Sequence, residues 1–290
     1  MGHRKFTGPG RALIILLGAS LVAVAVLAQD EKPAPKDDKK DQTAPQQVVP
    51  VTIPVTPRMK KSKDEVELIS LGELTIKEDG DEQNTLYVRN IGNNPISLAI
   101  LVQDDLVSSI SSEIPYIAEF IRHLPKESRV MVGYIRTGTL QIRQKFTSDL
   151  EKAASSLRIP VGAPSAAPYN PYVEVIEGLK RFESIPSGRR AMLVITDGLD
   201  SSRGTELGAS SQSIDLQRAI NEAQRRSVAI YGFYAPTAAT ANGRSFAAAD
   251  AQGSLIRLAK ETGGHAYFQG TGAPVSFDPY LRDLGSALTR

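Results

Sequence analysis

The chain has 290 residues, with 34 Lys and Arg against 32 Asp and Glu, no Cys and no Trp. This length is sufficient for one or two domains with a hydrophobic core. Without Cys the chain can form no disulfide, no thiolate nucleophile and no Cys-ligated zinc site, and its three His residues are too few for a multi-histidine metal centre. The nearly balanced charge predicts no nucleic-acid partner.

The first 28 residues have the pattern of a secretory signal peptide. Basic residues precede an apolar run from Ala12 to Leu27, and Ala28 with Val26 forms a tolerable cleavage site. The alternative is an uncleaved membrane anchor formed by residues 12–28, although this run is short for a bilayer span. Both interpretations predict export, to the periplasm or the extracellular space, and membrane attachment only if the segment is uncleaved.

Residues 29–64 are expected to be a linker, because the segment from Gln29 to Gln47 mixes Pro and charge with no large apolar residue. Residues 65–90 predict a small antiparallel β lead-in. Its turn is Glu78-Asp79-Gly80-Asp81, in which Gly can take a positive φ, and strand candidates flank this turn at 66–69, 74–77 and 85–88.

Residues 91–290 predict an α/β domain. Continuous apolar runs, typical of strands buried on both faces, alternate with helical patterns of 10 to 15 residues. This alternation favours a doubly wound, mostly parallel, Rossmann-like sheet with right-handed crossovers. The segment 140–146 follows its predecessor closely enough to be a hairpin partner at the sheet edge. The expected strands are 96–102, 130–135, 140–146, 191–195, 228–234 and 265–268, and the expected helices are 110–124, 150–157, 172–182, 214–225, 250–261 and 280–290.

Acidic and hydroxyl side chains follow the expected strands. In a doubly wound sheet, ligands bind at the carboxyl ends of the strands near the point where the strand order reverses. Carboxylate and hydroxyl oxygens are the ligands that Mg²⁺ or Mn²⁺ prefers. The candidates are Asp104, Asp105, Ser108, Ser109, Thr147, Thr196, Asp197 and Asp200.

In order and spacing these residues resemble the metal-ion-dependent adhesion site of the von Willebrand factor type A domain. That site has Asp-x-Ser-x-Ser after the first strand, a Thr in a later loop and an Asp after the fourth strand. The resemblance assigns Asp104 to the first Asp, Ser108 to the second Ser, Thr147 to the loop Thr and Asp197 to the final Asp. It implies that these four side chains converge within a few ångströms at one end of the sheet.

The resemblance covers about residues 65–290. The segments ELTIKEDGDEQ (73–83) and ETGGHAYF (261–268) are similar to the exported bacterial subgroup called VWFA-related. One ligand departs from the family pattern, since Leu106 stands where the first Ser is expected. This degenerate site is expected to bind Mg²⁺ or Mn²⁺ weakly, and Leu106→Ser is expected to strengthen Mg²⁺ binding. The alternative is that Asp104 and Asp197 are polar strand ends bonded to neighbouring loops, and that Thr147 caps a helix.

The favoured function is an exported, non-enzymatic protein-binding module, for adhesion or assembly, that engages an unknown protein through the strand-end face. One alternative is a metal-dependent phosphodiesterase or nuclease built from Asp104, Asp105, Asp197 and Asp200. The chain shows neither a Gly-x-Ser-x-Gly nucleophile elbow nor the surplus of basic residues that phosphate binding requires. The other alternative is a purely structural envelope protein.

Overall fold

The computed structural model describes residues 75–85, 94–136, 138–162, 170–202, 212–241, 245–274 and 276–289. The expected signal peptide, the expected linker and the strand candidates at 66–69 and 86–88 lie outside the described residues. Within the described ranges, the helices are too short or too polar to cross a membrane.

A small hairpin occupies the described part of the lead-in. Strands β1 (Ile76–Glu78) and β2 (Asp81–Gln83) pair in antiparallel register. The two residues between them, Asp79 and Gly80, have φ values of 52° and 98°, as a tight turn of the hairpin type requires. The predicted turn is therefore confirmed, and the second strand begins immediately after it rather than at residue 85.

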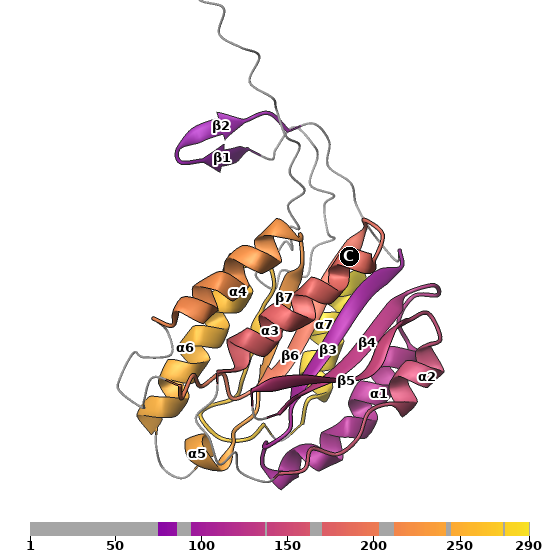
Figure 1. The fold of residues 1–290 in the computed structure, drawn as a ribbon, viewed down its shortest axis with the longest axis vertical. Helices are drawn as coiled ribbons and strands as arrows, with labels where there is room; N and C mark the ends of the chain where they lie inside the picture. Colours follow the sequence, from indigo (N-terminus) through magenta and orange to yellow (C-terminus); the bar gives the residue numbers. More distant parts are fainter. Residues whose placement is uncertain are drawn as a thin grey trace, which may run out of the picture. The chain divides into compact units, whose positions relative to one another are not determined.

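A six-stranded sheet forms the centre of the α/β domain, in the order β5-β4-β3-β6-β7-β8 (Figure 1). Every neighbouring pair is parallel except β4 and β5, which are antiparallel. This arrangement confirms the predicted fold class and the predicted edge hairpin. The strands are β3 (Ile96–Gln103), β4 (Arg129–Arg136), β5 (Thr139–Thr147), β6 (Arg189–Thr196), β7 (Ala229–Tyr234) and β8 (Ala266–Tyr267).

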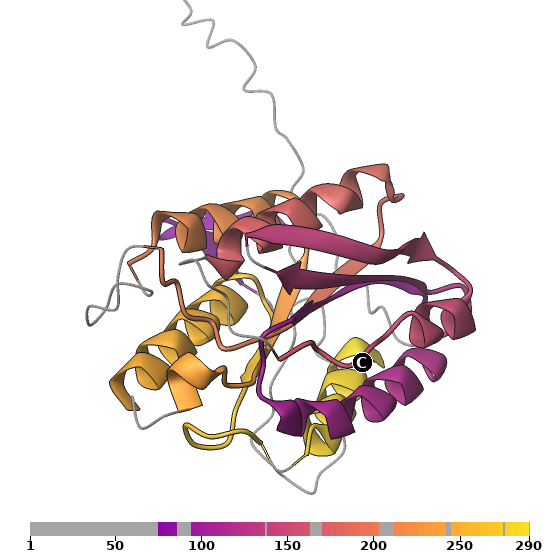
Figure 2. The same ribbon diagram turned by 60° about the horizontal axis from the view of Figure 1, so that its bottom comes forward.

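Helices cover both faces of this sheet (Figures 1 and 2). One face is packed by α1 (Ile114–Arg122), α2 (Leu150–Ser155) and α7 (Asp278–Thr289). The other is packed by α3 (Pro171–Lys180), α4 (Ile214–Arg225) and α6 (Ser245–Glu261). Short helical segments complete the chain, namely η2 (Ser108–Glu113), η3 (Arg181–Ser184) and α5 (Ala238–Ala241).

Strand β3 shows why the sequence contains continuous apolar runs. Successive side chains of a strand point to opposite faces. Leu98, Ile100 and Val102 join the core under α1, α2 and α7, whereas Ala99 and Leu101 join the core under α3 and α4. Because both faces are covered, neither set can be polar.

The strand order reverses beside β3. The chain leaves β3 to form β4 and β5 on one side, and then returns to form β6 on the other side. Strands β3 and β6 run parallel, with Val102 opposite Ile195, so their carboxyl ends meet at the reversal. We call the surface formed by the segments that follow the carboxyl ends of the parallel strands the strand-end face; Figure 2 turns it toward the viewer.

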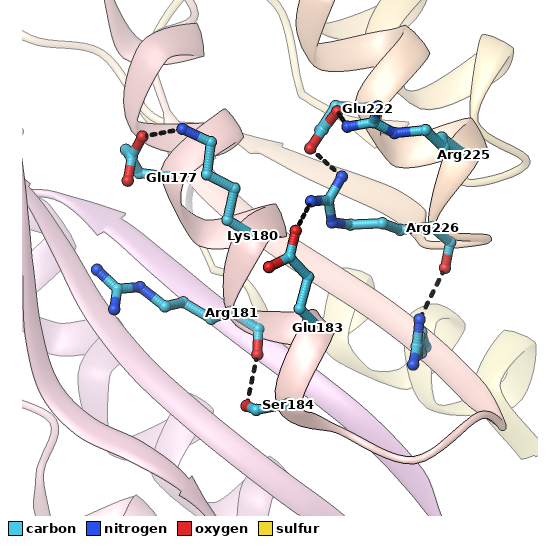
Figure 3. Close-up of polar contacts among 9 residues, drawn as sticks. Glu177, Lys180, Arg181, Glu183, Ser184, Glu222, Arg225 and Arg226 are labelled. Carbon is cyan, nitrogen blue, oxygen red and sulfur yellow. Dashed lines mark hydrogen bonds and ion pairs between the residues drawn. The ribbon is translucent and has the colours of Figure 1, made fainter.

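A charged network lies at the opposite, amino end of β6. The guanidinium group of Arg226, at the end of α4, pairs with Glu222 on the same helix and with Glu183 of η3 (Figure 3). Arg190, near the start of β6, donates to the carbonyl oxygen of Arg226 at 3.2 Å and to that of Ile185 at 2.6 Å. These contacts fix the end of α4 against β6.

The turn before β8 requires a residue without a side chain. A Cβ atom on Gly264 would lie 1.9 Å from the carbonyl oxygen of Ile230. We predict that Gly264→Ala lowers the free energy of unfolding by roughly 3 kcal/mol, because strand β7 would have to move. The control is Gly253→Ala in α6, where a Cβ would meet nothing within 4 Å, and which should raise stability by about 0.5–1 kcal/mol. Equal effects of the two changes in urea denaturation would contradict this account.

Candidate functional site

Two of the four predicted site residues lie next to each other at the strand-end face. Asp104 follows β3 and Asp197 follows β6, and these strands are neighbours in the sheet. Both carboxylates are 2% exposed. Ser108 is exposed and begins η2, shortly after Asp104 along the chain. The structure therefore brings Asp104 and Asp197 to the reversal point, as the sequence predicts.

Thr147 lies elsewhere, and the predicted convergence of all four residues is wrong. Thr147 is the last residue of β5 and pairs with Val130 at the start of β4, whereas Asp104 donates its backbone N–H to Ile135 near the end of β4. Because β5 runs antiparallel to β4, it carries Thr147 to the amino end of the sheet. There its hydroxyl accepts a hydrogen bond from the N–H of Asp149, the N-cap of α2, at 3.1 Å.

Leu106 is a core residue. Its side chain is 0% exposed and belongs to the cluster under α1 and α7. The backbone around it is also fixed, since Leu106 forms a β-bridge with Thr237 and Val107 donates to Pro236 at 3.0 Å. A hydroxyl at this position would be buried among apolar groups, so the expectation that Leu106→Ser improves a metal site does not fit the structure.

We predict instead that Leu106→Ser lowers the free energy of unfolding by about 3 kcal/mol, through loss of buried volume and burial of a hydroxyl. Calorimetry should show no gain in Mg²⁺ binding. The matched control is Ile256→Ser, because Ile256 is 43% exposed on α6 and its replacement should change stability by less than about 0.5 kcal/mol. Tighter Mg²⁺ binding by the Leu106 variant would contradict the placement of this residue.

Asp104 is neutralised by an arginine that the sequence analysis missed. Arg158, a short distance after α2, donates from Nη1 to Oδ1 of Asp104 at 2.6 Å and from Nη2 to Oδ2 at 2.8 Å. The N–H of Val161 donates to the same Oδ1 at 3.0 Å. Such a bidentate pair with a backbone donor is among the stronger polar contacts in proteins.

Arg158 is itself held in place on its other sides. Its guanidinium carbon lies 4.0 Å from the centre of the Tyr134 ring, as in a cation–π contact. The Tyr134 hydroxyl accepts from the N–H of Arg158 at 2.7 Å and donates to its carbonyl oxygen at 2.6 Å. Further on, Gly162 donates to the backbone oxygen of Asp104 at 2.9 Å. The ion pair and these hydrogen bonds therefore hold residues 158–162 against the carboxyl end of β3.

The charges around Asp104 favour its ionised form. Burial by itself would raise the pKa of Asp104, but the hydrogen bonds from Arg158 and Val161 and the positive charges of Arg158 and Arg136 outweigh it, so the pKa lies below its usual value. Arg136 adds a second guanidinium group, with Nε 3.7 Å from Oδ2. The hydrogen bond to Asp104 in turn raises the pKa of Arg158.

Asp197 has neutral partners. Its Oδ2 accepts from the Thr237 hydroxyl at 2.7 Å, and its Oδ1 accepts from the N–H of Leu199 at 3.1 Å. Burial, together with the negative charge of Asp105, raises the pKa of Asp197 to about 6 although these hydrogen bonds oppose the rise. The backbone N–H of Asp197 donates to Gln103 at 3.1 Å, and the amide of Gln103 donates to Asp105 at 2.8 Å.

Both carboxylate oxygens of Asp200 also accept hydrogen bonds from hydroxyl groups. It accepts from the hydroxyl of Ser202 at 2.6 Å and from the hydroxyl of Ser213, the N-cap of α4, at 2.6 Å. Asp104, Asp197 and Asp200 therefore each join neighbouring loops. For Asp104 and Asp197 this matches the alternative interpretation, in which they are polar strand ends bonded to neighbouring loops.

These residues do not fit a divalent metal ion. Asp104 uses both oxygens on Arg158, Leu106 lies in the core, and Thr147 lies at the other end of the sheet. Across the described ranges, the structure brings together no group of three or more His, Cys, Asp or Glu residues that could hold a metal. No step of the function proposed below depends on a metal.

Glu174 on α3 is a further buried acid, and the sequence analysis did not select it. It is 1% exposed, and both of its carboxylate oxygens are buried without a hydrogen-bond partner among the described residues. A Cβ on Gly138, in the β4–β5 turn, would lie 3.9 Å from Oε1. Burial, together with the negative charge of Glu177, raises the pKa of Glu174 to about 7.

This raised pKa predicts a pH-dependent stability. Between the ordinary glutamate pKa of 4.5 and the raised pKa of about 7, the folded chain binds a proton on Glu174 that the unfolded chain does not bind. The free energy of unfolding should therefore fall by roughly 3 kcal/mol as pH rises through this window. Urea denaturation at several pH values should show that Glu174→Gln removes the part of this fall above about pH 6, where Asp197 is already largely ionised, and that Glu177→Gln retains most of it. A fall of equal size in the Glu174 variant would contradict the assignment.

Comparisons with known proteins give distant structural neighbours. The sequence matches no family model and no curated protein. A conserved hypothetical protein, BatB from Bacteroides thetaiotaomicron, is 13% identical, with a TM-score of 0.45, over 66% of this chain and 97% of that one. An aerotolerance-related membrane protein from Bacteroides fragilis is 12% identical, with a TM-score of 0.45, over 67% and 98%.

A von Willebrand factor type A protein from Catenulispora acidiphila is 13% identical, with a TM-score of 0.45, over 68% of this chain and 42% of that chain. The neighbours thus include von Willebrand factor type A proteins. This is the family that the sequence resembles. Because sequence identity and TM-score are this low, the fold class rests on the strand order and helix layers described above, and the neighbours assign no ligand or partner.

Proposed function

We propose that this chain is an exported, non-enzymatic protein-binding module that engages another protein through its strand-end face. Export is inferred from the signal-like pattern of residues 1–28. The binding surface is inferred from the distribution of exposed apolar side chains over the α/β domain. These two inferences are independent of each other.

Exposed large apolar residues gather on the strand-end face. In parallel α/β units each helix starts where the preceding strand ends, so the first turns of α1, α4 and α6 lie on this face. The hydrogen bond from the Tyr172 hydroxyl to the carbonyl oxygen of Gly198, just after β6, places the first turn of α3 there too. With the exception of Ile256 in the middle of α6, every strongly exposed large apolar residue of the described ranges follows this rule or lies in a segment at the same end. They are Tyr116, Val173, Ile214 and Phe246 in the first turns of α1, α3, α4 and α6, Ile159 and Val161 after α2, and Phe268 after β8.

The most exposed of these side chains are 51% to 72% accessible, namely Tyr116, Ile159, Val161, Ile214 and Phe246. Single exposed apolar residues are common on protein surfaces, but their concentration on one face is typical of an interaction site. Aromatic residues are also enriched at the centres of protein interfaces. This one-sided distribution is the observation that carries the proposal.

The alternative of a phosphodiesterase has less support. Its four candidate carboxylates include Asp104, Asp197 and Asp200, which are buried and accept hydrogen bonds from protein groups. A hydrolytic site needs groups that reach the substrate and the attacking water. A purely structural role differs from the proposal in one respect, because it requires no binding at the strand-end face.

We predict that the double variant Ile159→Glu/Val161→Glu loses partner proteins. The full chain would be used to capture proteins from an envelope extract of the source cells, with quantification by mass spectrometry. Specific partners should fall at least about tenfold, as expected when interface-centre residues are removed. The matched control is Ile256→Glu, an exposed apolar residue away from this face, which should retain them. Equal capture by both variants, or no specific capture by the wild type, would contradict the proposal.

A further inference from the structure

We infer that the guanidinium group of Arg158 is a built-in cation that takes the place of a divalent metal ion beside Asp104. The role of Arg158 as a cation rests on the contacts of Asp104 alone, and only its role in positioning the apolar surface rests on the proposed function. The side chains that the structure places at the end of β3 differ from those of the metal site that the sequence resembles.

Both oxygens of Asp104 already accept hydrogen bonds, and a second guanidinium group lies beside Oδ2. A carboxylate has two oxygens with about four acceptor positions. Oδ1 accepts from Arg158 and from the N–H of Val161, and Oδ2 accepts from Arg158, with Nε of Arg136 3.7 Å away. A metal at this carboxylate would therefore compete with Arg158 for the same oxygens.

Electrostatics also oppose a metal. Two guanidinium groups already face Asp104, and an Arg side chain stays protonated at any physiological pH. A divalent ion at the same carboxylate would meet both positive charges. The nearest other carboxylate along the chain, that of Asp105, accepts from the amide of Gln103 at 2.8 Å.

Tyr134 holds the Arg158 side chain and backbone in one position. The Tyr134 ring lies under the guanidinium group, and the Tyr134 hydroxyl bonds to both backbone groups of Arg158. Tyr134 is fully buried in β4, so the residue that holds Arg158 is part of the central sheet. The Arg158 side chain is 27% exposed against 2% for Asp104, so the guanidinium group covers the carboxylate from the solvent side.

This arrangement makes Arg158 a positioning residue for the apolar surface. Ile159 and Val161 follow it directly and are 58% and 53% exposed. Both lie in the segment that Asp104 holds through Arg158 and through the N–H of Val161. The ion pair therefore presents two apolar side chains without the help of a metal.

The test measures the unfolding equilibrium of the full chain in urea, with 10 mM MgCl₂, MnCl₂ or EDTA at matched ionic strength. Divalent ions should leave the wild type unchanged. Arg158→Ala exposes the Asp104 charge and should raise the unfolding equilibrium constant by roughly a hundredfold in EDTA. Mg²⁺ or Mn²⁺ should reverse this change at least about threefold, because the uncovered carboxylate can now accept a metal.

The control is the double variant Asp104→Asn/Arg158→Ala, which lacks the carboxylate and should show no response to divalent ions. The inference fails if divalent ions stabilise the wild type but not Asp104→Asn, or if Arg158→Ala folds and neither ion restores it. If Arg158→Ala does not fold, the decisive measurement is Mn²⁺-induced broadening of amide resonances in the labelled wild type. Selective broadening at residues 103–106 would overturn the inference, and its absence would support it.

Discussion

The ion pair between Asp104 and Arg158 determines how the carboxyl end of the central strand is organised. Asp104 is almost completely buried, and an unpaired carboxylate there would cost several kilocalories per mole. The bidentate guanidinium group and the Val161 N–H remove this cost and fix the course of residues 158–162. A buried pair of this kind adds little to overall stability compared with apolar residues of similar volume, but it selects one arrangement of the loop.

The strand order of the sheet determines where this ion pair lies. The strand order reverses beside β3, so the ends of β3 and β6 meet at the position where doubly wound proteins bind ligands. In this chain the polar groups at this position bond to other groups of the protein. Arg158 covers Asp104, Thr237 bonds to Asp197, and Ser213 bonds to Asp200. What remains accessible is a rim of apolar side chains in the first turns of the helices and in the segments around them.

Much of the fold could be predicted from the sequence, because apolar periodicity reports burial directly. The run Ile96–Val102 is apolar throughout since both faces of β3 are covered, and the spacing of Ile214–Arg225 gave the bounds of α4. The site was harder to predict. Thr147 is misplaced because the resemblance follows the order of the motif, although the hairpin predicted for residues 140–146 already reverses the strand and places Thr147 at the amino end of the sheet. Leu106 is interpreted as a missing ligand, whereas it packs in the core. Arg158 belongs to none of the motifs found in the sequence, and only the three-dimensional path of the chain brings it to Asp104.

The central claim is that a guanidinium group, and not a metal ion, neutralises Asp104. The most direct measurement is a crystal structure of the chain grown with MnCl₂, with anomalous diffraction data collected to locate manganese. The account predicts Arg158 in bidentate contact with Asp104 and no anomalous peak at the ends of β3 and β6. A manganese ion coordinated by Asp104, with Arg158 displaced into solvent, would contradict it.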